Sequence, residues 1–151
     1  TMPARQKLSQ TQQGQEDVNE KNTQETSTQT VLPLILVVED SPTNQKIACK
    51  MLSKIGYRSM VAEDGQQALN ILASQREEIS LILMDCRMPI MDGLQATQAI
   101  RAQGDDIPIV ALTANNTAED RHACMQVGMD EFLSKPISKQ DLASVLQRFI
   151  P

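Results

Sequence analysis

Residues 81–93 read Leu-Ile-Leu-Met-Asp-Cys-Arg-Met-Pro-Ile-Met-Asp-Gly, and this stretch decides the fold. Its opening apolar run is too short for a buried helix and is typical of a strand covered on both faces of a parallel sheet. The run ends at Asp85, after which Pro89 and the pair Asp92-Gly93 indicate a loop before a helix. Because ligands of open α/β sheets bind beyond the carboxyl ends of the strands, Asp85 stands where a functional acid is expected.

The same alternation of apolar strand and amphipathic helix extends in both directions from Asp85. The predicted strands cover residues 34–38, 57–62, 79–84, 107–112 and 130–133. Helices are predicted to follow each of them, over residues 42–55, 65–73, 94–103, 117–127 and 142–149. In the first helix the apolar positions with helical spacing are Ile47, Met51, Leu52 and Ile55. The helix over 117–127 is only weakly amphipathic, so we expect it to pack loosely.

Five strand–helix units in succession predict an α/β fold. The expected architecture is (βα)5, a three-layer sandwich with a parallel five-stranded sheet between helices. The flavodoxin-like order 2-1-3-4-5 places the carboxyl ends of strands one and three side by side. Glu39 and Asp40 would then lie next to Asp85, and Thr113 and Lys135 would end strands four and five at the same edge.

This predicted convergence has a chemical consequence. Three neighbouring carboxylates raise one another's pKa unless a cation compensates, and hard oxygen ligands favour Mg²⁺. With Mg²⁺ bound, Asp85 could attack phosphorus and form an aspartyl phosphate. The equatorial oxygens of a transferring phosphoryl group need donors, which the Thr113 hydroxyl and the Lys135 ammonium group could supply.

Composition narrows the class of protein further. A chain of 151 residues suits one domain, and its net charge of −5 argues against direct nucleic-acid binding. No apolar run approaches a membrane span, and the three cysteines suggest free thiols in a reducing cytoplasm. Residues 1–32 are polar and lack a sustained apolar period, so we expect a disordered linker before a folded domain at 33–151. Because the chain opens on Thr1, we expect a fragment of a longer protein.

Five motifs together resemble the receiver domain of two-component response regulators, from about Leu34 to Ile150. They are Glu39-Asp40, Met84-Asp85, Met88-Pro89 with Met91-Asp92-Gly93, Ala111-Leu112-Thr113-Ala114 and Lys135-Pro136. Each alone is a weak signal, but five in this order at strand ends are specific. Residues 38–45 and 111–115 resemble more narrowly the receivers carried by hybrid sensor histidine kinases.

The resemblance implies a phosphoacceptor in a phosphorelay. Asp85 would take a phosphoryl group from a histidine kinase domain or a histidine phosphotransfer domain. Mg²⁺ would be held by Glu39, Asp40, Asp85 and the backbone carbonyl of Arg87. Thr113 and Lys135 would contact the phosphoryl group, and a cis peptide bond would precede Pro136. Thr113 and Phe132 would act as the switch that changes the surface formed by the last two helices and the last strand. Such a domain would be cytoplasmic, would touch no membrane even within a membrane-anchored parent, and would be a monomer or a weak dimer.

Other interpretations remain open at this point. Glu39-Asp40 alone could be a charged strand end with a helix cap, and Lys135 alone a solvated lysine. The domain could be an interaction module that works without phosphorylation, although the complete acidic set favours phosphoacceptance. An aspartate-nucleophile phosphatase would need a second acid at the position of Arg87, which counts against that class. The chain could come from a hybrid kinase or from a free-standing regulator.

Overall fold

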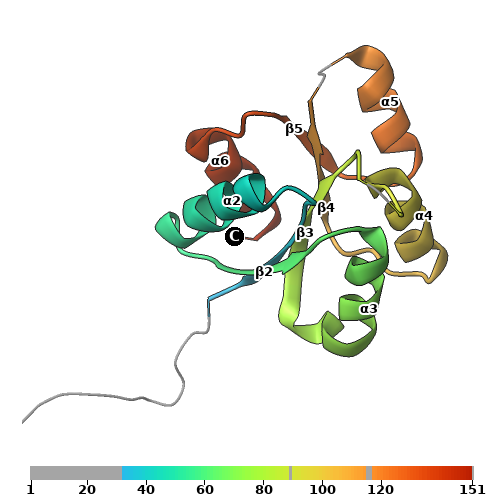
Figure 1. Cartoon of the computed structure of the whole chain (residues 1–151), viewed down its shortest axis with the longest axis horizontal. Coiled ribbons are helices and arrows are strands. Elements are labelled where there is room, and N and C mark those ends of the chain that lie inside the picture. The colour runs from blue at the N-terminus through green and yellow to red at the C-terminus, as the bar shows by residue number, and fades with distance from the viewer. Residues whose placement is uncertain (1–31, 89, 115–116, 151) are drawn as a thin grey trace, which may run out of the picture. The chain divides into compact units, whose positions relative to one another are not determined.

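The computed structural model describes residues 32–88, 90–114 and 117–150, and the predicted linker lies outside this range except for Leu32. Five parallel strands form one sheet in the order β2-β1-β3-β4-β5, as the sequence predicts (Figure 1). The strands are β1 (Leu34–Val38), β2 (Arg58–Ala62), β3 (Ile79–Asp85), β4 (Ile109–Thr113) and β5 (Glu131–Ser134). The helices are α2 (Pro42–Lys54), α3 (Gly65–Gln75), the short η3 (Arg76–Glu78), α4 (Gly93–Ala102), α5 (Ala118–Gln126) and α6 (Lys139–Phe149).

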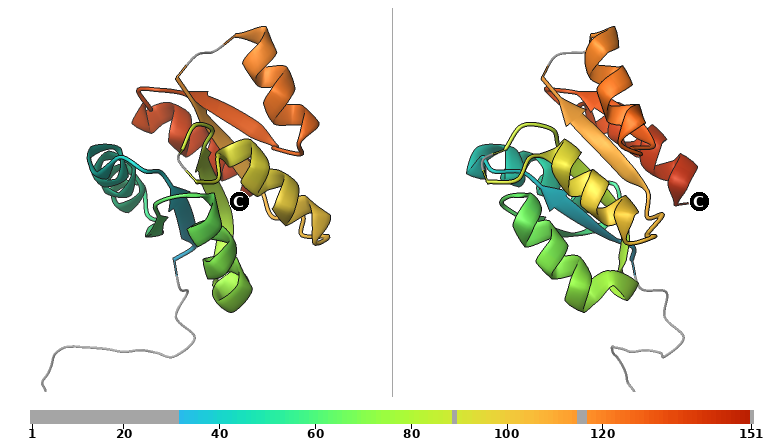
Figure 2. Two further views of the ribbon diagram at one scale, coloured as in Figure 1. Left: turned by 45° about the vertical axis from the view of Figure 1, so that its right-hand side comes forward. Right: turned by 90° about the vertical axis from the view of Figure 1, so that its right-hand side faces the viewer.

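Helices cover both faces of the sheet and give a three-layer sandwich (Figure 2). Successive side chains of a strand point to opposite faces, so each buried strand contributes to two cores. Leu36, Val38 and Met84 belong to the core under α3, α4 and α5, and Ile35, Val37 and Leu83 to the core under α2 and α6. The inner strands β1, β3 and β4 are therefore mostly apolar and buried, and the less buried β2 lies at an edge, as predicted.

A polar residue fixes the start of each of the five α-helices. The side chain before the helix accepts a hydrogen bond from the backbone N–H three residues later, at Ser41, Asp64, Asp92, Thr117 and Ser138. Such caps satisfy N–H groups that the helix itself leaves without partners. They also fix where each helix begins after the carboxyl end of its strand, at the edge of the sheet where the candidate site lies.

The connection from β3 to α4 is tightly packed. The N–H of Gly93 donates to the carbonyl of Cys86 at 3.2 Å. A Cβ atom at Gly93 would lie 2.9 Å from Cγ of Met84 and would overlap the carbonyl of Asp85. Ile90 has a φ of 68°, in the left-handed region that a β-branched residue rarely adopts. The loop is therefore held close to the end of β3.

Arg101 ties the end of α4 to the turn between α5 and β5. Its guanidinium group donates to the carbonyls of Gly128, Asp105 and Ile107, and to the carboxylate of Asp130 at 2.9 Å. Asp130 also accepts from the N–H of Ile109 at the start of β4. The carboxyl end of α5 is therefore fixed by polar contacts that its own weak apolar face does not provide.

Helices α5 and α2 differ in how well their apolar patterns predict burial. The weakly amphipathic α5 buries only Cys124 among its residues, as its pattern predicts. The prediction for Ile47 is wrong, because the residue is 43% exposed although its spacing suggests the core. On α2 the fully buried positions are Ala48 and Leu52, so Ile47 lies beyond the edge of the buried face.

Candidate functional site

The carboxyl ends of β1, β3, β4 and β5 lie around a cavity of about 380 Å³. Its lining includes Glu39, Asp40, Asp85, Arg87, Thr113 and Lys135. The structure thus brings together every residue that the sequence singles out except Phe132, which lies elsewhere on β5. Parallel strands make this possible, because all their carboxyl ends lie at one edge.

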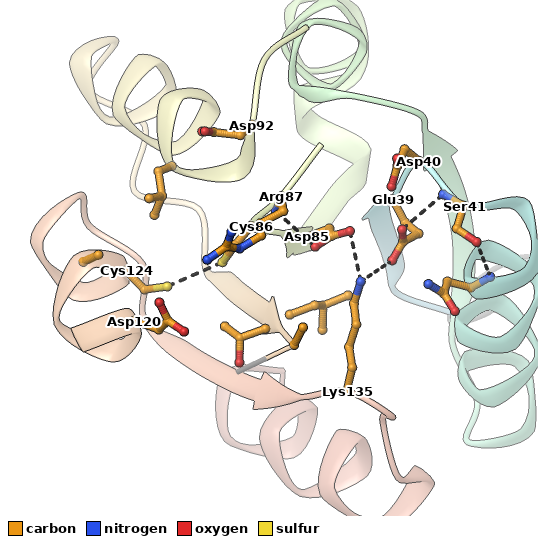
Figure 3. A pocket seen from close by; sticks show the side chains of 16 residues that line it. Glu39, Asp40, Ser41, Asp85, Cys86, Arg87, Asp92, Asp120, Cys124 and Lys135 are labelled. Atoms are coloured by element: carbon orange, nitrogen blue, oxygen red, sulfur yellow. Dashed lines mark hydrogen bonds and ion pairs between the residues drawn. The ribbon is translucent and has the colours of Figure 1, made fainter. Parts of the chain in front are cut away.

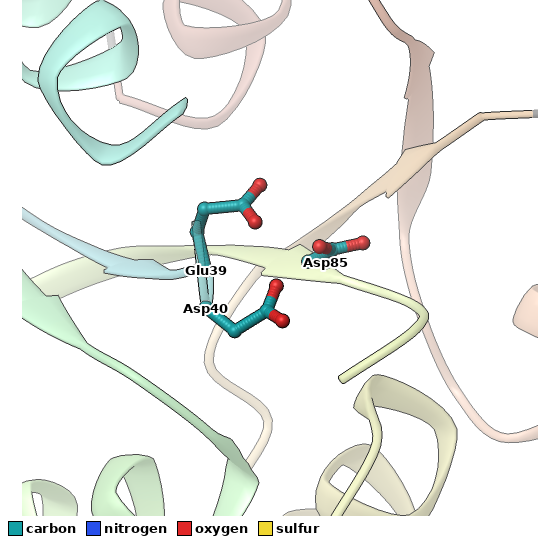
Figure 4. A group of neighbouring side chains, drawn as sticks. All are labelled: Glu39, Asp40 and Asp85. Atoms are coloured by element: carbon teal, nitrogen blue, oxygen red, sulfur yellow. The ribbon is translucent and has the colours of Figure 1, made fainter. Parts of the chain in front are cut away.

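Three carboxylates form the acidic part of the cavity. Glu39 and Asp40 follow β1, and Asp85 ends β3, so two adjacent inner strands supply them (Figure 4). One carboxylate oxygen from each lies within 4.8 Å of the others. Glu39 is 2% exposed and Asp85 5%, whereas Asp40 is open to solvent. This hard-oxygen set, with an open side where water can complete the coordination, fits Mg²⁺.

Lys135 supplies the positive charge next to these acids. Its Nζ donates to Oε1 of Glu39 and to Oδ2 of Asp85, each at 3.0 Å (Figure 3). Burial lowers the pKa of Lys135, but its bonds to Asp85 and Glu39 outweigh that effect, so the pKa lies above its ordinary value. Lys135 is therefore charged at neutral pH. It is followed by a cis peptide bond to Pro136, as the resemblance implies.

The two oxygens of Asp85 have different partners. Oδ1 accepts the backbone N–H of Arg87 at 3.2 Å, and Oδ2 accepts Lys135. The carboxylate is thus held in one orientation at the floor of the cavity. Glu39 is held in the same manner, because its Oε2 accepts the N–H of Ser41 at 3.1 Å.

Thr113 ends β4 on the opposite side of Asp85 from the β1 acids. Its Oγ1 is buried and has no hydrogen-bond partner among the described residues. A buried hydroxyl without a partner is costly, so its presence calls for an explanation. Its neighbour Ala114 is exposed and small, which leaves the approach to the cavity open. An oxyanion bound in the cavity is one partner that this hydroxyl could serve.

Phe132 lies on β5 beside Ala111 of β4, two residues before the position that pairs with Thr113. Because residues two apart share a face of a sheet, Thr113 and Phe132 both lie on the side that α5 covers. The guanidinium group of Arg121 in α5 stands 4.7 Å from the centroid of the Phe132 ring. The ring is half-buried under α5 and does not line the cavity.

Sequence reasoning missed the part of the cavity that lies under α5. Asp120 and Cys124 line it, and Sγ of Cys86 lies 3.5 Å from Sγ of Cys124 (Figure 3). Asp92, which caps α4, lines another part of the cavity. Burial foremost, and then Cys124 and Asp85, raise the pKa of the Cys86 thiol well above its usual range. The thiol is therefore protonated at neutral pH and is not a nucleophile in this cavity. No spacing in the sequence predicts this contact, because it joins β3 to α5.

The fold and the site together define a class. The family model described as the response regulator receiver domain matches residues 35–147. The chain therefore belongs to the receiver-domain family of two-component signalling systems, which confirms the resemblance seen in its motifs.

Two relatives that this chain resembles are sensor histidine kinases. The chain is 42% identical over 119 residues to sensor histidine kinase RcsC of Salmonella typhimurium, and 41% identical over 122 residues to sensor histidine kinase GacS of Pseudomonas protegens. These matches cover 76% and 78% of the chain but only 12% and 13% of the two kinases. The chain thus spans about an eighth of the length of these relatives.

Solved structures give the same result. The receiver domain of sensor histidine kinase PA1611 from Pseudomonas aeruginosa, solved with a magnesium ion coordinated in its active-site cleft, is 45% identical. The match has a TM-score of 0.73 and covers 80% of this chain and 98% of that domain. Among the residues described here, no helix combines the length and apolar character that crossing a bilayer requires.

Proposed function

We propose that this receiver domain accepts a phosphoryl group on Asp85 from a phosphohistidine, as one step of a phosphorelay. The observation that carries the proposal is the pairing of Asp85 with Lys135 in a cavity that also contains two further acids and the unpartnered hydroxyl of Thr113. A purely structural ion pair would need neither the additional acids nor a buried hydroxyl without a partner.

The reaction follows from the positions of these groups. A carboxylate oxygen of Asp85 attacks phosphorus, the bond from phosphorus to the imidazole nitrogen breaks, and the histidine leaves as imidazole after taking up a proton. Negative charge on the equatorial oxygens is stabilised by the Lys135 ammonium group and the Thr113 hydroxyl. Hydrolysis of the acyl phosphate later restores the Asp85 carboxylate and releases inorganic phosphate.

Glu39, Asp40 and Asp85 are the side chains that would hold Mg²⁺, with the backbone carbonyl of Arg87 as a further ligand. Bound there, the ion would neutralise charge that develops on the phosphoryl oxygens. The open side of the cavity at Asp40 leaves room for the waters that Mg²⁺ retains. The Mg²⁺ bound in the cleft of the PA1611 receiver domain supports this assignment.

The partner would be a histidine kinase domain or a histidine phosphotransfer domain, within a hybrid kinase or in a separate chain. Phosphorylation would draw Thr113 inward, and Phe132 would follow it, so that the α5–β5–α6 surface changes. A disordered linker over residues 1–32, the domain boundary at 33, a cytoplasmic location and a monomeric or weakly dimeric state remain predictions.

The test is the intact mass of the protein after incubation with Mg²⁺ and acetyl phosphate. We expect the mass to rise by one phosphoryl group in the natural protein and not to rise in Asp85→Asn or without Mg²⁺. Asp64→Asn is the matched control, because Asp64 is also a buried acid but caps α3, and asparagine caps a helix equally well.

If neither acetyl phosphate nor a phosphorylated histidine phosphotransfer domain adds mass to the natural protein, the phosphoacceptor function is wrong. The receiver fold would then serve as an interaction module that works without phosphorylation. If Asp85→Asn gains as much mass as the natural protein, the site is wrong.

A further inference from the structure

Phe132 carries a contact that neither the proposed chemistry nor the metal site uses. The guanidinium group of Arg121 stands over the face of its ring, 4.7 Å from the centroid. This distance is within the range in which an arginine and an aromatic face attract each other. The contact joins α5 to β5, two elements of the surface that would respond to phosphorylation.

The rest of α5 packs weakly against the domain. Cys124 is its one buried residue, and the helix has hardly any apolar face. Arg101 ties only the turn after the helix, through Gly128 and Asp130. The contact of Arg121 with Phe132 lies in the amino-terminal half of α5, so it restrains the part of the helix that Arg101 does not reach.

Phe132 shares a sheet face with Thr113, whose buried hydroxyl has no partner among the described residues. If Thr113 moves toward a phosphoryl group, it leaves space on this face beside Phe132. A ring that enters that space moves toward Thr113 and away from its present place, 4.7 Å from the guanidinium carbon of Arg121. The cation–π contact therefore belongs to one of the two positions of the ring and not to the other.

We propose that Arg121 is a positioning residue that holds Phe132 under α5 in the unphosphorylated domain and so sets how readily the domain switches. The proposal rests on the proposed function of Asp85 and adds a restraint specific to the arginine of this chain. A cation–π contact at a partly exposed site corresponds to about a two- to fivefold shift in a two-state equilibrium. By linkage, a group that favours the unphosphorylated state weakens the response to a phosphoryl donor by the same factor.

The chain itself offers a way to follow this ring. It contains only two phenylalanines, Phe132 and Phe149, and Phe149 lies under Arg148 with 5.7 Å between guanidinium carbon and ring centroid. Protein with ¹³C-labelled phenylalanine rings should therefore give two sets of ring resonances in NMR spectra. Arg148→Ala is the comparison variant for Arg121→Ala, because it removes a cation–π contact from Phe149, together with the ion pair of Arg148 with Glu131 of β5, and leaves the contact of Arg121 with Phe132 in place.

The experiment titrates natural protein, Arg121→Ala and Arg148→Ala with acetyl phosphate at saturating Mg²⁺, following the rings by NMR and the phosphorylated fraction by mass. We expect Arg121→Ala to move the Phe132 resonances toward their phosphorylated positions before any donor is added. The concentration that phosphorylates half the protein should fall about two- to fivefold, as the contact's strength predicts. Arg148→Ala should leave the Phe132 resonances before donor is added closer to those of the natural protein than Arg121→Ala does, because it keeps the contact of Arg121 with Phe132.

A double-mutant cycle separates the ring contact from every other interaction of Arg121. In a Phe132→Leu background, Arg121→Ala should change the half-maximal concentration no further. An equal effect of Arg121→Ala with and without the ring would overturn the proposal, as would an unchanged half-maximal concentration in the single variant. If Phe132 does not respond although mass shows phosphorylation of Asp85, the proposal also fails while the phosphoacceptor function stands. If no protein is phosphorylated, the proposed function fails first.

Discussion

Lys135 shares one positive charge between the carboxylates of Glu39 and Asp85, so a metal ion entering the cavity meets a like charge. We expect Lys135→Met to bind Mg²⁺ on the order of tenfold more tightly, since removing a nearby unit charge changes binding by roughly 1–2 kcal/mol in a partly solvated site. The same variant should be phosphorylated more slowly, because the phosphoryl oxygens lose a donor. Calorimetric titration with MgCl₂ measures the first effect and mass spectrometry the second.

Lys139→Met is the control, because it removes the same charge at the exposed start of α6. Equal Mg²⁺ affinities for Lys135→Met and the natural protein would show that Lys135 does not oppose the ion. The sequence could predict that Lys135 and Asp85 meet, because both follow strand ends. It could not predict that Glu39 shares the lysine, because that contact depends on how the loop after β1 directs the Glu39 side chain.

Asp105 makes the stability of the domain depend on acid pH. It accepts two hydrogen bonds from Arg76, at 2.7 and 2.9 Å, and this contact foremost lowers its pKa below the ordinary 3.8. A carboxyl group with a lowered pKa in the folded state adds stability above its unfolded pKa and loses it as pH falls through the folded pKa. The contribution should therefore be complete well above the ordinary pKa of 3.8 and be lost as the pH falls below it, through the lowered pKa of the folded state.

We expect Asp105→Asn to lower the free energy of unfolding at pH 7 by about 1 kcal/mol or less, because the Arg76 side chain is 39% exposed and solvent screens the pair. Urea denaturation from pH 2 to pH 7 measures this, and the two curves should converge at the acid end. Asp106→Asn, at the neighbouring exposed acid, is the control, and its free energy of unfolding should match that of the natural protein at every pH. A variant curve that runs parallel to the natural one at all pH values would contradict the assignment.

At the scale of elements, α5 should open independently of the rest of the domain. Its cap, Thr117, accepts a hydrogen bond from the N–H of Asp120 at 3.1 Å. Thr117→Val removes that acceptor with little change of shape and should cost about 1 kcal/mol. Because α5 buries little apolar surface, we expect this loss of stability to appear as faster amide hydrogen exchange within α5. The urea midpoint of the whole domain should hardly change.

Thr117→Ser retains the hydroxyl and should exchange like the natural protein. A shift of the urea midpoint that equals the exchange effect would show that α5 unfolds only with the whole domain. The sequence did predict the loose packing, because residues 117–127 lack an apolar face. It misjudged Ile47, because apolar spacing marks the buried side of a helix but not how far burial reaches around it. It also gave no sign of the contacts of Arg101, since a lone arginine does not indicate which carbonyls lie around it.

At the scale of the whole molecule, the acidic cluster joins the ends of β1 and β3, two adjacent inner strands of the sheet. Mg²⁺ bound there should stabilise the entire folded state by mass action, by about 2.7 kcal/mol at a concentration a hundred times its dissociation constant. Urea denaturation at increasing MgCl₂ measures this, with NaCl at equal ionic strength as control. Asp40→Asn should reduce the gain. Equal stabilisation by NaCl and MgCl₂ would show a general salt effect in place of a site.

The order of the strands was predictable because five apolar runs alternate with helices, and parallel connections leave few topologies. The meeting of Glu39, Asp40 and Asp85 followed from that order alone. The cavity under α5 was not predictable, because its walls come from loops and from a helix whose sequence does not fix its position.

The ties that Arg101 makes at one end of α5 give that helix the geometry of a lever. Its nine residues, Ala118–Gln126, span about 13 Å along the axis. Pivoting about the turn at Gly128, a tilt of about 10° would carry the far end of the helix roughly 2 Å, from simple trigonometry on that length. A small side-chain movement beneath α5 would thereby produce a larger displacement at the exposed end of the helix, while the sheet stays unchanged.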